Sequence, residues 1–145
     1  IEAIPPTEFA EQLAAQAHSL AGGRLRVTVQ AEAAPPFWFM DRYLVETAML
    51  NAVHNGLEYA RAEISISVRS EDGGLSLCVH DDSDGYPAHI LDNQGQAPGR
   101  SGIGSGTGLG LYFARAIAAA HENRGRRGRL SLSNDAGAVF CLWLP

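Results

Sequence analysis

Two asparagines with helical spacing are the first side chains of this sequence that could do chemistry. Asn51 and Asn55 are four residues apart in a segment with the apolar periodicity of a helix, so both carboxamides project from one face. An amide oxygen is a neutral, hard ligand that suits Mg2+, and the amide NH2 group can donate to phosphate oxygens. Such a pair alone more often belongs to the polar face of a helix or caps it. The assignment therefore depends on the rest of the chain.

The second group of candidates follows an alternating apolar run that ends at Val79. The chain then reads His-Asp-Asp-Ser-Asp-Gly-Tyr-Pro over 80–87. A carboxylate at a strand end, such as that of Asp81, can accept a hydrogen bond from an exocyclic amine. A nearby glycine, Gly85, lets the backbone approach a flat ring. By itself the segment fits a plain acidic turn equally well.

The third candidate is a glycine run that leads into a predicted helix. Residues 102–111 read Gly-Ile-Gly-Ser-Gly-Thr-Gly-Leu-Gly-Leu. Successive small residues expose N–H groups, and the helix start adds partial positive charge, so the run could bind a polyphosphate. The glycines of a Rossmann fold follow a strand within a βαβ unit, whereas these follow a long irregular segment over 81–106. The context therefore disfavours a Rossmann fold.

Composition removes several other ways of holding a phosphate. The chain has 145 residues, 46% hydrophobic and 19% charged, as expected of one domain. All eleven basic residues are arginine. A Walker A loop and Schiff-base chemistry both need lysine, so the sequence excludes them. The net charge of −5 argues against a nucleic-acid partner. Any phosphate must be held by backbone N–H groups, a metal, asparagine or arginine.

Apolar periodicity predicts the elements that must position these groups. Helices are expected over 7–21, 42–60 and 107–121, with Thr7 and Asp41 able to cap the first two. Strands are expected over 24–32, 64–68, 75–79, 129–134 and 138–144, and the last four form two hairpins. Residues 33–40 are an extended connection. This order predicts an α/β fold, a two-layer sandwich in which three helices cover one face of a mixed sheet of about five strands.

Three further expectations concern the cysteines, membrane or signal segments, and the extent of the chain. Cys78 and Cys141 lie in alternating apolar runs without the spacing of a zinc or redox pair, so we expect both to be reduced. No apolar stretch approaches the roughly 20 residues that span a bilayer, and no signal peptide is visible. The chain begins at Ile1, so we expect residues 1–145 to form a single domain from a longer protein.

Taken together, the three groups resemble a known family. Residues 51–60, Asn-Ala-Val-His-Asn-Gly-Leu-Glu-Tyr-Ala, look like the N box of sensor histidine kinases. Residues 81–87 are similar to their first glycine box, and residues 106–111 reproduce the second. Three boxes in this order, over nearly the whole chain from Thr7, resemble the catalytic ATP-binding domain of these kinases. The resemblance implies the Bergerat ATP-binding fold, which gyrase and related chaperones share.

The resemblance also assigns roles to individual residues, with ATP and Mg2+ as ligands. Asn55 would coordinate Mg2+ and Asn51 would support the phosphates or the metal, and both would serve catalysis. Asp81 would receive the adenine amino group, and Gly85 would let the base pass. A flexible ATP lid is expected over about 88–106. The nucleotide site would be completed by Tyr59, Arg100, Gly106, Thr107, Gly108, Leu109 and Gly110.

The implied reaction is transfer of the ATP γ-phosphoryl group to a histidine on a separate dimerisation domain of the same protein. Asn51 stands where the ATP hydrolases of this superfamily carry a glutamate, and an amide cannot act as a base, so transfer fits better than hydrolysis. The implied partners are that dimerisation domain and a response regulator. The domain would be cytoplasmic and would not itself insert into a membrane. The parent would be a homodimer, with inner-membrane anchoring as one option.

Several positions depart from the family pattern. Glu58 stands where these kinases often have a cation, for which Arg61 and Arg100 are candidate replacements. Ser83 replaces the first glycine of its box, which requires a negative φ. Two alternatives stay open: a non-catalytic nucleotide-sensing pseudokinase module and an anti-sigma-type serine kinase. The acceptor histidine is expected outside this chain, and His121 is expected to be structural. The arginine run over 124–129 is expected to be a solvated loop, with a docking patch for an acidic partner as the lesser option.

Overall fold

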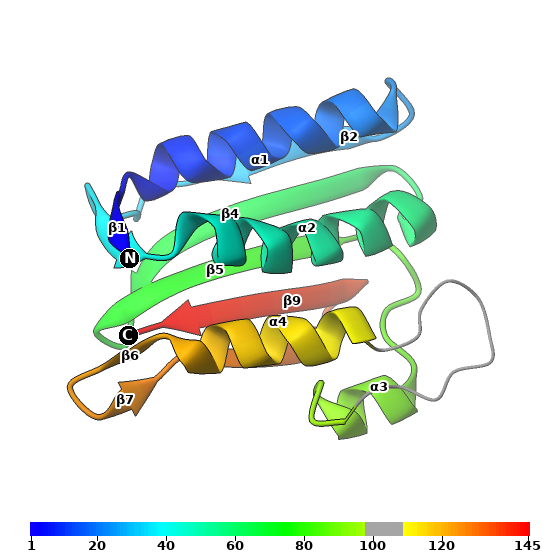
Figure 1. Cartoon of the computed structure of the whole chain (residues 1–145). Coiled ribbons are helices and arrows are strands. Elements are labelled where there is room, and N and C mark those ends of the chain that lie inside the picture. The colour runs from blue at the N-terminus through cyan, green and yellow to red at the C-terminus, as the bar shows by residue number, and fades with distance from the viewer. Residues whose placement is uncertain (98–108) are drawn as a thin grey trace.

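Five strands form one mixed sheet in the order β2–β4–β5–β9–β8 (Figure 1). The computed structural model describes residues 1–97 and 109–145. The parallel pair is β2 with β4, and the other neighbours are antiparallel. The strand bounds are Arg26–Gln30 for β2, Glu63–Glu71 for β4, Gly74–Asp81 for β5, Arg129–Asn134 for β8 and Ala138–Leu144 for β9. The predicted mixed sheet of about five strands is therefore confirmed.

Three helices cover one face of this sheet (Figure 1). They are α1 (Pro6–Ala21), α2 (Arg42–Tyr59) and α4 (Leu109–Ala120), and a short helix, α3 (Ala88–Asn93), follows β5. The core lies between the layers, because alternate strand residues such as Leu77 and Phe140 meet apolar helix residues such as Met49. The two-layer sandwich is confirmed. No helix in the described part of the chain is long and apolar enough to cross a bilayer.

The helix ends show which local signals were correct. The Asp41 side chain accepts a hydrogen bond from Leu44 N at 3.0 Å and so caps α2, as predicted. The predicted cap at Thr7 is wrong. α1 begins at Pro6, follows Pro5, and has no side-chain cap. Proline suits the first helical position because its missing N–H would have no helical partner there.

Two small sheets lie outside the predicted elements. β1 (Glu2–Ile4) pairs with β3 (Trp38–Met40), so part of the expected extended connection is a strand. β6 (Glu122–Asn123) pairs with β7 (Arg126–Arg127), so the predicted arginine loop over 124–129 contains one strand of a short hairpin. The acidic neighbours of this loop bind its arginines: Asp72 pairs with Arg126 and Arg129, and Glu122 pairs with Arg127. These pairs favour the solvated loop over a docking patch.

His121 joins the end of α4 to the start of α2. Its Nε2 accepts a hydrogen bond from Asp41 N at 3.1 Å, and its Nδ1 lies 2.9 Å from Ile117 O. A backbone N–H can only donate and a carbonyl can only accept, so the proton is on Nδ1. The residue is 4% exposed. The structure supports the expected structural role of His121.

A disulfide joins Cys78 on β5 to Cys141 on β9, so the expectation that both cysteines are reduced is wrong. The two residues are register partners on neighbouring antiparallel strands, with Cα atoms 4.2 Å apart. They are 63 residues apart in the sequence. The spacing of the cysteines in the sequence could not predict this pair, because the pairing of β5 with β9 in the sheet brings the two residues together.

Reduction of this disulfide should destabilise the domain. A cross-link that closes a loop of this length lowers the entropy of the unfolded chain, which corresponds to about 4 kcal/mol of stability. We expect a lower urea midpoint in reductant than without it. The double variant Cys78→Ser/Cys141→Ser should show the lower midpoint in both conditions. An equal midpoint for the wild type with and without reductant would contradict the disulfide.

Candidate functional site

Asn51 and Asn55 lie half-buried on α2, and Asn51 meets the start of α4. A Cβ atom at Gly110 would lie 2.2 Å from Asn51 Oδ1 and 2.3 Å from its Nδ2, closer than any side chain could come. The glycine therefore lets α4 lie directly against the Asn51 carboxamide. Neither asparagine side chain makes a hydrogen bond within residues 1–97 and 109–145. Two of the three predicted groups thus meet, with polar atoms that a ligand could use.

Asp81 ends β5 with one carboxylate oxygen fixed and the other open. Its Oδ1 accepts hydrogen bonds from Ser83 N at 2.9 Å and Ala138 N at 3.2 Å. Its Oδ2 accepts none from the described residues. In that part of the chain, Trp38 Nε1 is the only fully buried side-chain polar atom without a partner, so Asp81 Oδ2 reaches solvent. Because the residue is 7% exposed, this oxygen is an acceptor in a largely enclosed position.

Gly56 brings α2 close to Asp81, and the sequence analysis missed it. A Cβ at Gly56 would lie 3.0 Å from Ile64 Cδ1 and 3.8 Å from Asp81 Cβ. The residue that follows Asn55 therefore lies against the end of β5. A glycine inside an otherwise regular helix costs about 1 kcal/mol relative to alanine and usually has a packing reason, so this was the available signal.

The loop after Asp81 is compatible with its serine. Ser83 is not among the non-glycine residues with positive φ, so its backbone meets the condition that a serine at this position requires. Its Oγ accepts a hydrogen bond from Gly85 N at 3.1 Å. Gly85 has a φ of 90°, and a Cβ there would lie 2.6 Å from Asn134 Cγ. The structure therefore gives Gly85 a packing reason beside its predicted role.

The adjacent carboxylate, Asp82, has a different task. It accepts hydrogen bonds from Arg61 N at 2.8 Å, Ala62 N at 3.1 Å and Glu63 N at 3.3 Å, and so holds the connection from α2 to β4. These bonds, that from Ala62 first, lower the pKa of the Asp82 carboxyl against the opposing effect of desolvation. Asp82 is thus a structural residue, whereas Asp81 has one oxygen that accepts no hydrogen bond from the described residues.

Two more of the predicted site residues lie at the ends of helices in the described part of the chain. Tyr59 and Leu109 are 54% and 43% exposed, at the end of α2 and the start of α4. Their predicted roles stay predictions. Arg100, Gly106, Thr107 and Gly108 lie outside the described residues, as do residues 98–106 of the predicted lid. Arg61, the other candidate cation, pairs with Asp84.

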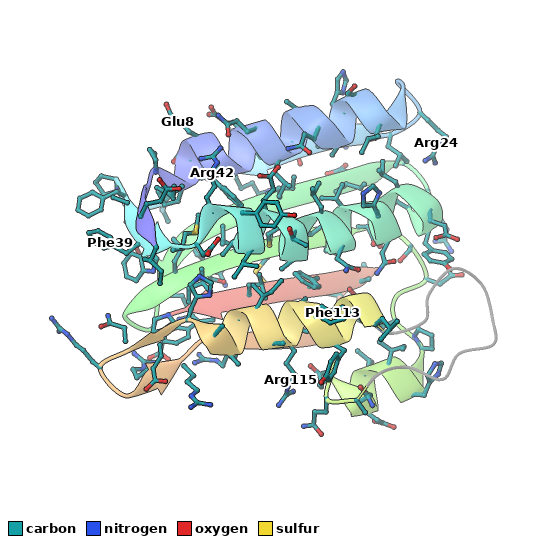
Figure 2. The ribbon with its side chains drawn as sticks, viewed as in Figure 1. Glu8, Arg24, Phe39, Arg42, Phe113 and Arg115 are labelled. Atoms are coloured by element: carbon teal, nitrogen blue, oxygen red, sulfur yellow. A yellow bond between two sulfur atoms is a disulfide. The ribbon has the colours of Figure 1, made fainter. Side chains whose placement is uncertain are left out.

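The first part of the predicted lid is tied to the domain. Ile90 and Leu91 of α3 pack against the core. The Gln94 side chain makes hydrogen bonds of 2.8 Å to both Leu132 N and Leu132 O. Arg115, which Figure 2 labels on α4, donates to Gln94 O at 3.1 Å. These contacts hold residues 90–94, within the described part of the predicted lid, against α4 and β8.

These features lie at one end of the molecule, formed by the end of β5, the last turns of α2, the start of α4 and the β8–β9 turn (Figure 1). Residues 40–145 match the family described as histidine kinase-, DNA gyrase B- and HSP90-like ATPases. The chain belongs to this ATPase family. The resemblance drawn from the three sequence boxes is confirmed.

Known relatives of this ATPase domain include two sensor kinases. It is 32% identical over 114 residues to the sensor protein KdpD of Escherichia coli, covering 73% of this chain and 12% of KdpD. It is 28% identical over 112 residues to the signal transduction histidine-protein kinase AfsQ2 of Streptomyces coelicolor, covering 73% of this chain and 20% of AfsQ2. The chain thus spans a fifth or less of these relatives. It is an ATPase domain of the sensor histidine kinase type.

Solved structures share the fold of the ATPase domain. The catalytic domain of histidine kinase ThkA superimposes with a TM-score of 0.82 at 18% identity, covering 99% of this chain and 94% of ThkA's. Full-length ShkA in complex with AMPPNP superimposes with a TM-score of 0.82 at 17% identity, covering 99% of this chain and 30% of ShkA. At these identities the likeness concerns the fold alone.

The variant Asp81→Asn should separate ligand binding from folding. Asparagine keeps an oxygen that can accept from Ser83 N and Ala138 N, but it replaces the open oxygen with a donor. We expect the affinity for ATP to fall by about tenfold or more, with a nearly unchanged thermal midpoint of the nucleotide-free domain. Competition against a fluorescent ATP analogue measures the first quantity. Glu11→Gln, the same carboxylate-to-amide change at an exposed position of α1, is the matched control. Equal losses of affinity and midpoint would make Asp81 a structural turn residue.

Asp82 should give the domain a pH-dependent stability. Its pKa is lower in the folded than in the unfolded state. The stabilisation is therefore present above the unfolded pKa, about 4, and is lost as the pH falls through the folded value. Urea unfolding should show Asp82→Asn to be less stable than the wild type at pH 7, with a difference that shrinks in acid. A difference that stays constant across this range would contradict the assignment.

Proposed function

We propose that this chain binds Mg-ATP as the catalytic domain of a sensor histidine kinase and transfers the γ-phosphoryl group to a histidine on a separate dimerisation domain. The observation that carries the proposal is the contact between α2 and the end of β5. There Gly56 lies against Asp81 and directly follows Asn55. A base acceptor and a phosphate or metal ligand are thereby close enough for one nucleotide.

The Asp81 carboxylate would recognise the base. Two backbone N–H groups orient it before any ligand arrives, so little freedom remains to be lost on binding. Its open oxygen can only accept, and therefore it favours a base with an exocyclic amine, such as adenine. Gly85 would leave the adjoining backbone close to the ring.

The amides of α2 would hold the phosphate end. Mg2+ usually keeps several waters and takes one or two protein ligands together with substrate phosphates, so a single oxygen from Asn55 suits it. Bound Mg2+ would neutralise charge on the β- and γ-phosphates. Asn51, which has no hydrogen-bond partner in the described residues, would donate to a phosphate oxygen. Arg100 and the glycine run 106–110 are proposed as further phosphate contacts.

The chain's own contribution to the reaction would be positioning. The acceptor imidazole nitrogen forms a bond to the γ-phosphorus while the bond from that phosphorus to the bridging oxygen breaks, which leaves ADP. Asn51 cannot take a proton from water, so no base in its position promotes hydrolysis. Catalysis would come from in-line orientation and charge stabilisation.

The exposed side of α4 would contact the dimerisation domain. Tyr112 and Phe113 are 36% and 56% exposed, with ring centroids 5.7 Å apart, and Phe113 lies on the outer surface of α4 (Figure 2). Leu109 extends this apolar surface to the residue beside Gly110. A helical partner seated there would bring its histidine to the phosphate end.

The proposal also covers the parent protein. The parent would be a homodimer whose partner is a response regulator. This domain would be cytoplasmic, with inner-membrane anchoring of the parent as one option.

The metal assignment is tested by removing Mg2+ and Asn55 separately. We expect EDTA to weaken ATP binding by the wild type by about tenfold or more, because the phosphate charge loses its compensation. Asn55→Ala in Mg2+ should bind like the wild type in EDTA and should no longer respond to EDTA. Asn123→Ala, an exposed asparagine on β6, is the control and should behave as the wild type.

Radiolabelled ATP and the full-length parent protein test the reaction itself. An acid-labile phosphoryl group on histidine would support the proposal. ATP binding without phosphorylation would favour the nucleotide-sensing module, for which exposed Glu58 in place of a cation is the motivating feature. An acid-stable phosphoserine on a partner would favour the serine kinase. Wild-type protein that does not bind millimolar Mg-ATP would overturn the proposal.

A further inference from the structure

Asn134 makes a two-bond contact with the loop that follows Asp81. Tyr86 N donates to Asn134 Oδ1 at 2.7 Å, and Asn134 Nδ2 donates to Tyr86 O at 3.0 Å. The carboxamide therefore uses its acceptor and one donor on the two backbone groups of a single residue. It acts on that residue as a neighbouring strand would, although the two positions are 48 residues apart.

The same carboxamide lies against Gly85. A Cβ at Gly85 would come within 2.6 Å of both Asn134 Cγ and Asn134 Oδ1. With a φ of 90°, Gly85 adopts a conformation that other residues rarely take. The position of Gly85 relative to Asp81 thus depends on the contacts that the Asn134 carboxamide makes.

The β8–β9 turn also holds the beginning of this loop. Ala138 N donates to Asp81 Oδ1, and Gly137 lies so close to Asp81 O that a Cβ there would be 1.8 Å away. His80 Nε2 lies 2.7 Å from Asp135 O. One turn, residues 134–138, therefore fixes both ends of the segment 81–86.

Tyr86 connects this contact to the charge of the site. Its side chain packs against the core. Burial, and then the negative charge of Asp81, raise the pKa of the Tyr86 hydroxyl, so the ring is neutral at physiological pH. Tyr86, whose backbone is hydrogen-bonded to Asn134, is therefore close enough to the Asp81 carboxylate to interact with it electrostatically.

We propose that Asn134 is a positioning residue for base recognition. It acts through Gly85 and Tyr86 to set the distance between the loop and the open oxygen of Asp81, without touching the ligand. The inference rests on the proposed function, because it assumes that Asp81 receives the amine of adenine. Loss of the Asn134 carboxamide should weaken recognition of the base and leave the phosphate contacts of α2 intact.

Inosine triphosphate provides the discriminating ligand, because it carries a carbonyl oxygen where ATP carries the exocyclic amine. For Asn134→Ala we expect ATP affinity to fall by about fivefold to tenfold and inosine triphosphate affinity to change by less than about twofold. The ratio of the two affinities should fall accordingly. Competition against a fluorescent ATP analogue, in Mg2+, measures both. Asn123→Ala is the control, and Asn134→Ser, which can make one of the two bonds, should give a smaller change.

Amide hydrogen exchange supplies a readout that needs no nucleotide. The Tyr86 N–H should exchange faster in nucleotide-free Asn134→Ala than in the wild type, whereas the Leu44 N–H, capped by Asp41, should not change. An unchanged affinity ratio in both Asn134 variants, with ATP binding by the wild type intact, would overturn this inference alone. So would equal losses for both nucleotides with a lower thermal midpoint, which would make Asn134 merely structural. A wild type that binds neither nucleotide would overturn the proposed function and this inference with it.

Discussion

The candidate site depends on the orientation of one carboxylate. Asp81 closes β5, and two backbone N–H groups from different segments fix its Oδ1. A free carboxylate in water would have to be ordered and desolvated by its ligand, and this one is ordered by the fold instead. The neighbouring Asp82 directs its oxygens to the backbone of Arg61, Ala62 and Glu63, so two adjacent acids serve different purposes. The difference follows from which backbone groups each one faces.

Charge imposes the second constraint. A chain with a net charge of −5 and no lysine must hold a triphosphate by other means. Two described arginines near this end of the molecule are already engaged, since Arg61 pairs with Asp84 and Arg115 bonds to Gln94 O. Neutral amides lose less hydration than charged groups when a phosphate displaces their water. The asparagines of α2 therefore suit a site whose surroundings are acidic.

The sequence could predict what depends on local periodicity and chemistry. The alternation of Leu75, Leu77 and Val79 predicted a strand, Asp41 predicted a helix start, and the order of elements predicted the sandwich. Contacts between distant segments could not be predicted in this way. The disulfide joins residues 63 apart, and Asn134 reaches Tyr86 across 48, because the sheet order sets which strands are neighbours. β1 and β3 escaped prediction because three residues are too few to show a period.

The hydrogen bond between His121 and the start of α2 limits how the two helices can move. α2 and α4 lie side by side in opposite directions, and this contact joins them at the end far from Asp81 (Figure 1). If the spacing between the helices changes at the other end, α4 must rotate about the His121 contact. Its 12 residues give an arm of about 18 Å, so a swing of about 5° displaces its first residue by about 1.5 Å. A small angular adjustment is thus converted into a shift comparable to a covalent bond length.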